Sequence, residues 1–150
     1  MATSTLTERR YDRNRRGAWG LTLTCGAAVS TLHFAGLAYD IYTELWWWDV
    51  LTHTTSGFGV AAILYLLSAE LRLGLFRNRF GLFVLLPVCV LAIGAWFEVY
   101  ERVFKDFWFR WSLAYYWDDT FKDLVADTLG AVAFGVVFRA YKRSRDWMRV

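Results

Sequence analysis

Residues 46–67 read WWWDVLTHTTSGFGVAAILYLL. Three tryptophans begin this stretch, Asp49 and His53 follow one helical turn apart, and the remainder is small or apolar. A helix needs roughly 20 residues to cross the hydrocarbon core of a bilayer, and this stretch is long enough. Tryptophan is enriched where a membrane helix meets the headgroup region. The stretch therefore predicts a transmembrane helix with a polar pair near one membrane surface.

Three further stretches have a similar length and composition. Residues 19–39 and 80–97 contain no Asp, Glu, Lys or Arg, and residues 121–138 become apolar after their first two turns. Pro87 lacks an N–H and should distort the third stretch. Apolar residues make up 57% of the chain, above the 45–50% usual for soluble domains. We therefore expect the whole chain, 1–150, to form one all-α, polytopic membrane domain: a four-helix transmembrane bundle.

Two alternatives compete with this prediction. The basic residues 9–16 precede an apolar stretch, as in a secretory signal peptide, but that stretch is longer than usual and lacks a clear cleavage motif. A soluble helical bundle would carry polar residues along the whole length of each helix. In this chain the polar residues gather at one end of each apolar stretch, which favours membrane helices.

The net charge of +3 conceals two regions of opposite sign. In a four-span arrangement, residues 1–18, 68–79 and 139–150 lie on one side and contain 13 basic and four acidic residues. The other side and its helix ends contain four basic and ten acidic residues. Because basic segments stay in the cytoplasm, we predict a multi-pass protein of the plasma (inner) membrane with both termini cytoplasmic. We expect no nucleic acid among its partners.

An aromatic segment separates the last two spans. Residues 104–117, FKDFWFRWSLAYYW, contain eight aromatics among fourteen residues, with too many charges for a span. Such a segment is typical of an interfacial helix, and its tryptophans and tyrosines suit headgroup depth. We expect it to lie on the outer leaflet, where it serves either as a membrane anchor or as a lid over a binding site.

Ionisable residues inside membrane helices cost roughly 2.5–3.5 kcal/mol each and usually face the bundle interior, where they serve a function. Eight ionisable residues gather inside the spans or at their ends on the acidic side: His33, Asp49, His53, Glu98, Glu101, Asp119, Asp123 and Asp127. Residues three or four apart share one helix face. Counting about 1.5 Å per residue from the outer ends puts His33, His53 and Asp127 at nearly the same depth. The spans should therefore bring these side chains together.

Imidazole and carboxylate groups on facing helices are the ligands of Zn, Mn and Fe in helical bundles. We expect Asp49, His53, Asp123 and Asp127 to bind a divalent metal ion, with Zn, Mn, Fe or Mg as the candidates. The two cysteines do not enter this prediction, because they lie apart inside apolar stretches and show no metal-binding or disulfide spacing.

Other polar residues have less specific interpretations. Glu98 and Glu101 are expected to supply a further ligand or the general base of a reaction. Asp119 is expected at the edge of the site, and His33 is expected to satisfy a polar neighbour. The competing interpretation is a network of hydrogen bonds and ion pairs that fixes the helix register without a metal. Its basic members would be Arg102, Lys105 and Lys122.

A weak internal repeat and a family resemblance point to the same residues. Aligning residues 48–59 with 122–133 pairs Asp49 with Asp123 and His53 with Asp127, as in two similar hairpins about one site. Three patches also occur in order: D-x-x-x-H-x-x-x-G from Asp49, WFEVYE at residues 96–101, and WDDTFKD followed by LGA within residues 117–131.

On these patches, residues 45–135 resemble the small prokaryotic inner-membrane proteins typified by YjdF and, more distantly, the VanZ-like proteins. The resemblance implies membrane location and a shared polar site, and it implies no particular reaction. YjdF-like proteins usually have more spans. Asp127 stands where the VanZ-like pattern has Asn, which adds a carboxylate and favours a cation site.

Three functional hypotheses follow, and the sequence does not decide whether the protein is an enzyme. In the first, the outer-leaflet site binds a cation or a lipid headgroup and supports metal-dependent chemistry on a lipid, including a polyprenyl-type substrate. In the second, the chain is a non-catalytic membrane subunit or a small ion- or proton-coupled transporter component. In the third, it is a structural component of an oligomer or of a larger membrane complex.

Overall fold

The computed structural model describes residues 2–104 and 111–147, and the side chains of residues 19–104 and 111–144. The elements are α1 (Ala2–Ala38), α2 (Ile41–Glu44), α3 (Trp47–Glu70), the π-helical turn η1 (Gly81–Leu85), α4 (Leu86–Phe104) and α5 (Leu113–Trp147). Within these residues no strand is present. The expected all-α class is therefore confirmed.

Among the described residues, four helical segments are long and apolar enough to cross a membrane: Trp19–Ala38, Trp47–Glu70, Gly81–Phe104 and Leu113–Ser144. Large apolar side chains such as Phe34, Trp96 and Leu129 are exposed on their outer surfaces. A soluble monomer rarely exposes so much contiguous apolar surface, whereas a bilayer accommodates it. The chain is thus a polytopic helical membrane protein.

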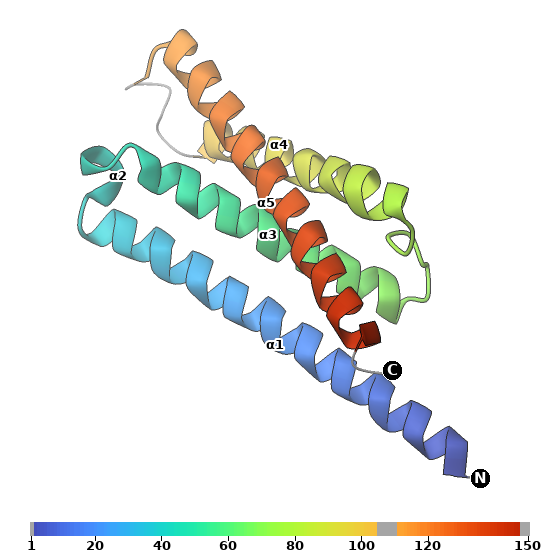
Figure 1. Cartoon of the computed structure of the whole chain (residues 1–150). Helices are drawn as coiled ribbons and strands as arrows, with labels where there is room; N and C mark the ends of the chain where they lie inside the picture. Colours follow the sequence, from blue (N-terminus) through green and yellow to red (C-terminus); the bar gives the residue numbers. More distant parts are fainter. Residues whose placement is uncertain (1, 105–110, 148–150) are drawn as a thin grey trace.

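Helix α3 lies at the centre of the arrangement and packs against α1, α4 and α5. Helices α4 and α5 also pack against each other. Figure 1 shows the two ends of the chain at one end of the bundle, while α2, the end of α4 and the start of α5 lie at the other. The sequence therefore enters α3 and α5 from the same end.

The distortion expected at Pro87 takes the form of a π-helical turn. Pro87 has no N–H to offer the carbonyl of Phe83, four residues earlier. Directly before it, the N–H of Leu86 bonds to the carbonyl of Gly81, five residues back. The helical residues 79 and 80, directly before η1, follow a side-chain cap, because Asn78 Oδ1 accepts the N–H of Gly81 at 2.7 Å.

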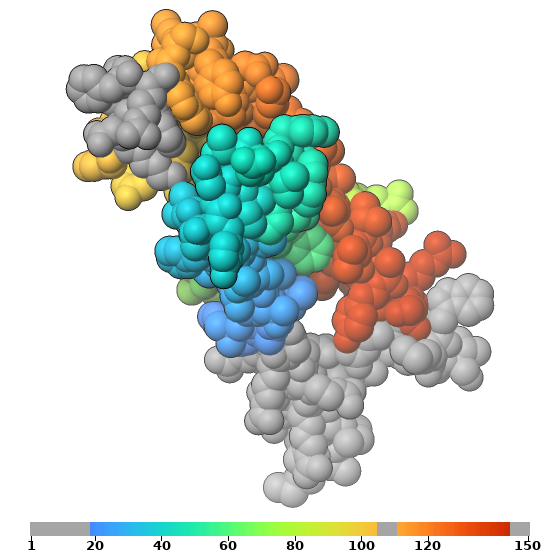
Figure 2. Space-filling view, turned by 90° about the vertical axis from the view of Figure 1, so that its left-hand side faces the viewer, coloured from blue at the N-terminus to red at the C-terminus, as the bar shows by residue number. Residues whose placement is uncertain are grey.

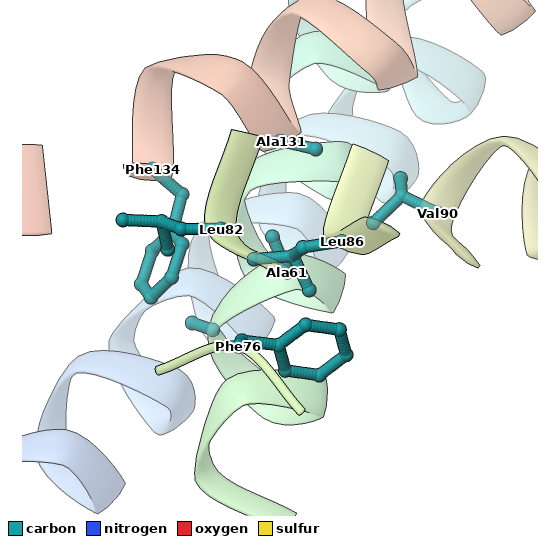
Figure 3. Packing of buried hydrophobic residues seen from close by; sticks show 8 residues of the cluster. Ala61, Phe76, Leu82, Leu86, Val90, Ala131 and Phe134 are labelled. Atoms are coloured by element: carbon teal, nitrogen blue, oxygen red, sulfur yellow. The ribbon is translucent and has the colours of Figure 1, made fainter. Parts of the chain in front are cut away.

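The apolar core lies in the half of the bundle nearer the chain ends. Its members come from α3, α5, the α3–η1 loop, η1 and α4, and Figure 3 shows their packing: Ala61, Ala62, Phe76, Leu82, Leu86, Val90, Ala131 and Phe134. The members on α3 follow His53, and those on α5 follow Asp127. The core therefore closes the bundle below the polar residues.

Two glycines bring α3 and α5 into close contact. A Cβ atom on Gly57 would collide with the backbone carbonyl of Asp127, and one on Gly130 would collide with that of Thr54. Small residues are used in this way where membrane helices approach backbone to backbone. The contact places the middle of α5, which carries Asp127, directly against the polar face of α3.

The aromatic segment at residues 104–117 is divided between elements. Helix α4 ends at Phe104, residues 105–110 lie outside the described residues, and α5 begins at Leu113, earlier than the expected position 121. Ser112 favours this earlier start because its Oγ accepts the N–H of Tyr115 at 3.2 Å. Tyr116 also packs inward, with only 5% of its surface exposed.

Candidate metal centre

The polar face of α3 turns His53 toward three carboxylates. His53 Nε2 lies 3.7 Å from Asp49 Oδ1, one turn earlier on α3, and 3.7 Å from Asp123 Oδ1 on α5. On the other side of the ring, His53 Nδ1 lies 3.5 Å from Asp127 Oδ2. The four residues predicted from the sequence therefore come together around one imidazole.

Burial differs across the cluster. The side chains of Asp123 and Asp127 are 6% and 10% exposed, that of His53 is 14% exposed, and that of Asp49 is 34% exposed. Carboxylates held inside a bundle require compensation by a cation, a proton or hydrogen bonds. These exposures indicate that the cluster opens to its surroundings beside Asp49 and is closed at Asp123 and Asp127.

Three of these residues form a group that can hold an ion. One ligand atom from each of Asp49, His53 and Asp123 lies within 4.8 Å of the others, and this is the group found among the residues that the structure describes. Ligand atoms about 2.0–2.1 Å from a tetrahedral Zn²⁺ are roughly 3.3–3.4 Å apart. The observed separations of 3.7 Å from Nε2 are therefore slightly wider than a bound zinc ion requires.

Asp127 faces the opposite ring nitrogen from this group, and its position is fixed by two glycines. A Cβ on Gly94 of α4 would come within 2.7 Å of Asp127 Oδ2, and Gly57 of α3 lies against the Asp127 backbone. The three helices thus leave little space around this carboxylate. Its place beside Nδ1 is the arrangement that orients a metal-binding histidine.

Glu98 is buried in a separate polar contact beside the cluster. It is 5% exposed, and its Oε2 accepts the hydroxyl of Thr120 at 2.9 Å. Its backbone carbonyl accepts the hydroxyl of Tyr116 at 3.2 Å, and the Arg102 guanidinium lies 4.2 Å from the centre of the Tyr116 ring. These bonds attach the start of α5 to the end of α4.

The other predicted acids occupy the edge. Asp119 and Glu101 are partly buried and lie outside the group of three ligand residues. Lys122, which the network interpretation would use, pairs with the exposed Asp118 one turn earlier. Lys105 lies outside the described residues. The ion pair between Lys122 and Asp118 therefore forms on the protein surface and does not neutralise the buried carboxylates.

His33 belongs to a second contact, as expected for a histidine that satisfies a neighbour. Its Nδ1 lies 3.0 Å from the hydroxyl of Tyr42 on α2, and Thr52 of α3 lies close to the same hydroxyl. Burial raises the pKa of Tyr42, so its hydroxyl is neutral at physiological pH. Figure 2 shows α2 and the start of α3 forming one surface beside α1.

Three hydroxyl groups in these contacts do not follow from the sequence pattern, those of Tyr42, Tyr116 and Thr120. Tyr42 follows the first span, and Tyr116 lies in the aromatic segment, where a tyrosine needs no partner. Thr120 offered a usable signal, because it lies between the acids of the WDDTFKD patch and starts the polar stripe of α5. Hydroxyls inside a membrane bundle commonly bond to a neighbouring helix.

The comparison with known proteins gives a family for the chain. Residues 11–144 match the family described as "Predicted membrane protein (DUF2238)". No curated protein and no solved structure matches the chain. The match includes all four membrane-spanning segments and every residue of the polar cluster. The chain therefore belongs to this family of predicted membrane proteins.

Proposed function

We propose that the cluster binds a divalent metal ion through Asp49, His53 Nε2 and Asp123. The observation that carries the proposal is the convergence of one ligand atom from each residue within 4.8 Å. Nitrogen and oxygen ligands of this kind suit Zn²⁺, Mn²⁺ and Fe²⁺, and a site richer in carboxylate and water suits Mg²⁺. Three protein ligands leave coordination positions open, as in a catalytic rather than a purely structural site.

In this proposal Asp127 acts on the metal through His53. Its Oδ2 lies 3.5 Å from Nδ1, so an Nδ1–H directed at the carboxylate leaves the Nε2 lone pair for the ion. This role differs from the direct ligation expected from the sequence. It accounts for the deep burial of Asp127 on the side of the ring away from Asp49.

The open positions would take the headgroup of a lipid. The partial exposure of Asp49 gives an approach from one side, and the surrounding helices expose apolar surface to the bilayer. A phosphate oxygen is a suitable ligand for the proposed ion. Glu98 and Glu101 are the nearest further acids on α4 and are the proposed sources of a general base for water. A lipid or polyprenyl-type phosphate is thus the proposed substrate class.

The proposed topology puts this site in the outer leaflet of the plasma (inner) membrane. Both chain ends would then be cytoplasmic, which follows from the excess of basic residues on their side. The proposal also includes the resemblance to YjdF-like proteins of the three patches that contain Asp49, Glu98 and Asp123. It implies that relatives with these patches share the metal site.

The ion-transport alternative receives less support from the packing. The buried core of Ala61, Leu86 and Phe134 fills the bundle between the cluster and the chain ends. A proton or ion path through a single chain would need polar groups or water there. The described residues therefore favour a site that opens on one side only.

The direct test is a metal assay on protein purified in detergent. We expect the wild-type chain to bind a stoichiometric amount of one transition metal and to melt at a higher temperature with it. Free metal at about 100 times its Kd adds roughly 2.7 kcal/mol to stability. His53→Ala and Asp123→Asn should each abolish the bound metal and the thermal shift.

Asp118→Asn is the matched control for Asp123→Asn, because Asp118 lies on the same helix, α5, but is exposed and pairs with Lys122. It should retain both the metal and the thermal shift. If the wild-type protein binds no metal and Zn, Mn, Fe and Mg leave its melting temperature unchanged, the metal proposal is wrong. Loss of stability in His53→Ala without any metal effect would instead support the ion-pair network.

A further inference from the structure

A cavity of about 320 Å³ lies at the opposite end of α3 from the metal centre. Tyr65, Ser68 and Ala69 of α3 form one wall, and Arg72, Phe76 and Arg77 are among the loop residues that form the other. This loop lies between the spans Trp47–Glu70 and Gly81–Phe104. The cavity is therefore at the depth where a bilayer places its headgroups.

The loop is held in one shape by its own hydrogen bonds. Helix α3 ends with the N–H of Leu73 bonded to the carbonyl of Ser68 at 2.9 Å and the N–H of Arg72 bonded to that of Ala69 at 3.2 Å. Ser68 Oγ accepts the N–H of Leu75 at 3.1 Å, and Phe76 is buried in the apolar core. The cavity wall is thus built before any ligand arrives.

Arg72 occupies a backbone position that usually belongs to glycine. Its φ is 57°, in the left-handed region that closes this type of helix end. A side chain there is strained relative to glycine, and strained residues are a reason to search for a function. The strain is retained together with a guanidinium that lines the cavity.

The chemistry of the cavity suits a phosphate group. Arg72 and Arg77 both line it, and among the described residues no carboxylate forms an ion pair with either. Guanidinium groups bind phosphate through paired, charge-assisted hydrogen bonds. Tyr65 adds an apolar wall, held by ring contacts with Phe134 and Phe138 at 5.9 and 4.3 Å. Basic pockets between membrane helices are known sites for anionic headgroups.

We propose that Arg72 and Arg77 bind the phosphate of an anionic phospholipid in this cavity. The site is separate from the metal centre. Its ligand is a phosphate group, which could reach it either as part of a lipid or as free phosphate. The partly buried Tyr65 ring favours the lipid, because it would lie against the glycerol and the first acyl carbons. The proposal does not depend on the metal centre.

The test uses protein purified from membranes that contain both phosphatidylglycerol and phosphatidylcholine. Native mass spectrometry measures how much of each lipid the protein retains. The wild-type chain should retain phosphatidylglycerol preferentially. The double variant Arg72→Gln with Arg77→Gln should lower that retention by about tenfold or more, as expected for the loss of charge-assisted bonds. Arg79→Gln is the matched control, since it removes an exposed arginine from the same loop that does not line the cavity.

Arg72→Gly separates binding from folding. It removes the guanidinium and also relieves the left-handed strain, so it should melt at the same or a higher temperature while retaining less phosphatidylglycerol. Displacement of the lipid by millimolar inorganic phosphate would identify a site for free phosphate, and resistance to displacement would identify the lipid. Equal retention by the double variant and the wild type, or an equal loss in Arg79→Gln, would overturn the proposal.

Discussion

His53 uses its two ring nitrogens for different neighbours. Nε2 faces Asp49 and Asp123, and Nδ1 faces Asp127. A neutral imidazole carries one proton, so a carboxylate at Nδ1 determines which nitrogen is free to bind an ion. In the proposed metal site the three acids around the ring therefore have different roles, although all are aspartates on two packed helices.

Asp127→Asn tests this division of roles. The substitution preserves the shape of the side chain but removes the charge beside Nδ1, and the amide can donate a hydrogen bond that moves the ring proton to Nε2. We expect metal affinity to fall by about 10–100-fold, the usual effect of changing a residue that orients a ligand. Calorimetric metal titration measures the fall.

The comparison variant is Asp123→Asn, which removes a ligand atom and should abolish specific binding. If Asp127→Asn abolishes binding to the same extent, Asp127 is itself a ligand. An affinity equal to that of the wild type would show that the Nδ1 contact is irrelevant to the ion.

At this scale, the sequence predicts which residues meet but not their roles. Helical spacing puts Asp49 with His53 and Asp123 with Asp127 on shared faces, and matching depth brings these faces together. The side of the imidazole that each carboxylate takes depends on ring orientation, which spacing does not determine. The bond from Thr120 to Glu98 joins two helices, and nothing in their separate patterns fixes it.

The packing of α3 against α5 positions the cluster at the scale of whole helices. Gly57 lies against the backbone of Asp127, and Gly130 lies against the backbone of Thr54, the residue after His53. Close backbone approach lets short aspartate side chains reach the imidazole from the neighbouring helix. Longer side chains would be needed if the helices stood apart.

Gly57→Ala and Gly130→Ala test this contact. Each added methyl group would overlap a backbone carbonyl of the facing helix, which cannot rotate away as a side chain can. We expect a loss of about 1–3 kcal/mol in stability, the usual cost of overpacking. Metal binding should weaken as well, because the helices must separate. Thermal unfolding in detergent, with and without metal, measures both effects.

Gly26→Ala is the control, because no atom lies within 4 Å of the added methyl group. It should be neutral or stabilising by up to about 1 kcal/mol, since alanine is the better helix former. Tolerance of Gly57→Ala to the same degree as Gly26→Ala would contradict the close-contact argument.

The helix boundaries show where sequence patterns stop being informative. Apolar length predicts the four spans, because a bilayer imposes a length on each helix. Pro87 predicts a local distortion but not the π-helical turn that absorbs it. The early start of α5 depends on Ser112 and on the burial of Tyr116 against α4, which are tertiary contacts inside an aromatic segment.

Across the whole molecule, polar and apolar interior are divided between the two halves of the bundle. One half contains the aspartate and histidine cluster, and the other contains the apolar core followed by the arginine-lined cavity. The core separates the two sites. The two proposed ligands are a cation near one membrane surface and a phosphate near the other. Each has the opposite charge to the side of the protein on which its site lies.

The charge distribution predicts the orientation, and cysteine labelling tests it. In a chain carrying Cys25→Ala and Cys89→Ala, we expect Thr43→Cys to react with an impermeant maleimide on intact cells, because Thr43 is exposed on α2 at the acidic end. Ser144→Cys, exposed near the end of α5, should react only after the membrane is opened. The reason is the retention of basic segments in the cytoplasm. The reverse labelling pattern would move the metal site to the cytoplasmic leaflet and restrict its lipid substrates to those of that leaflet.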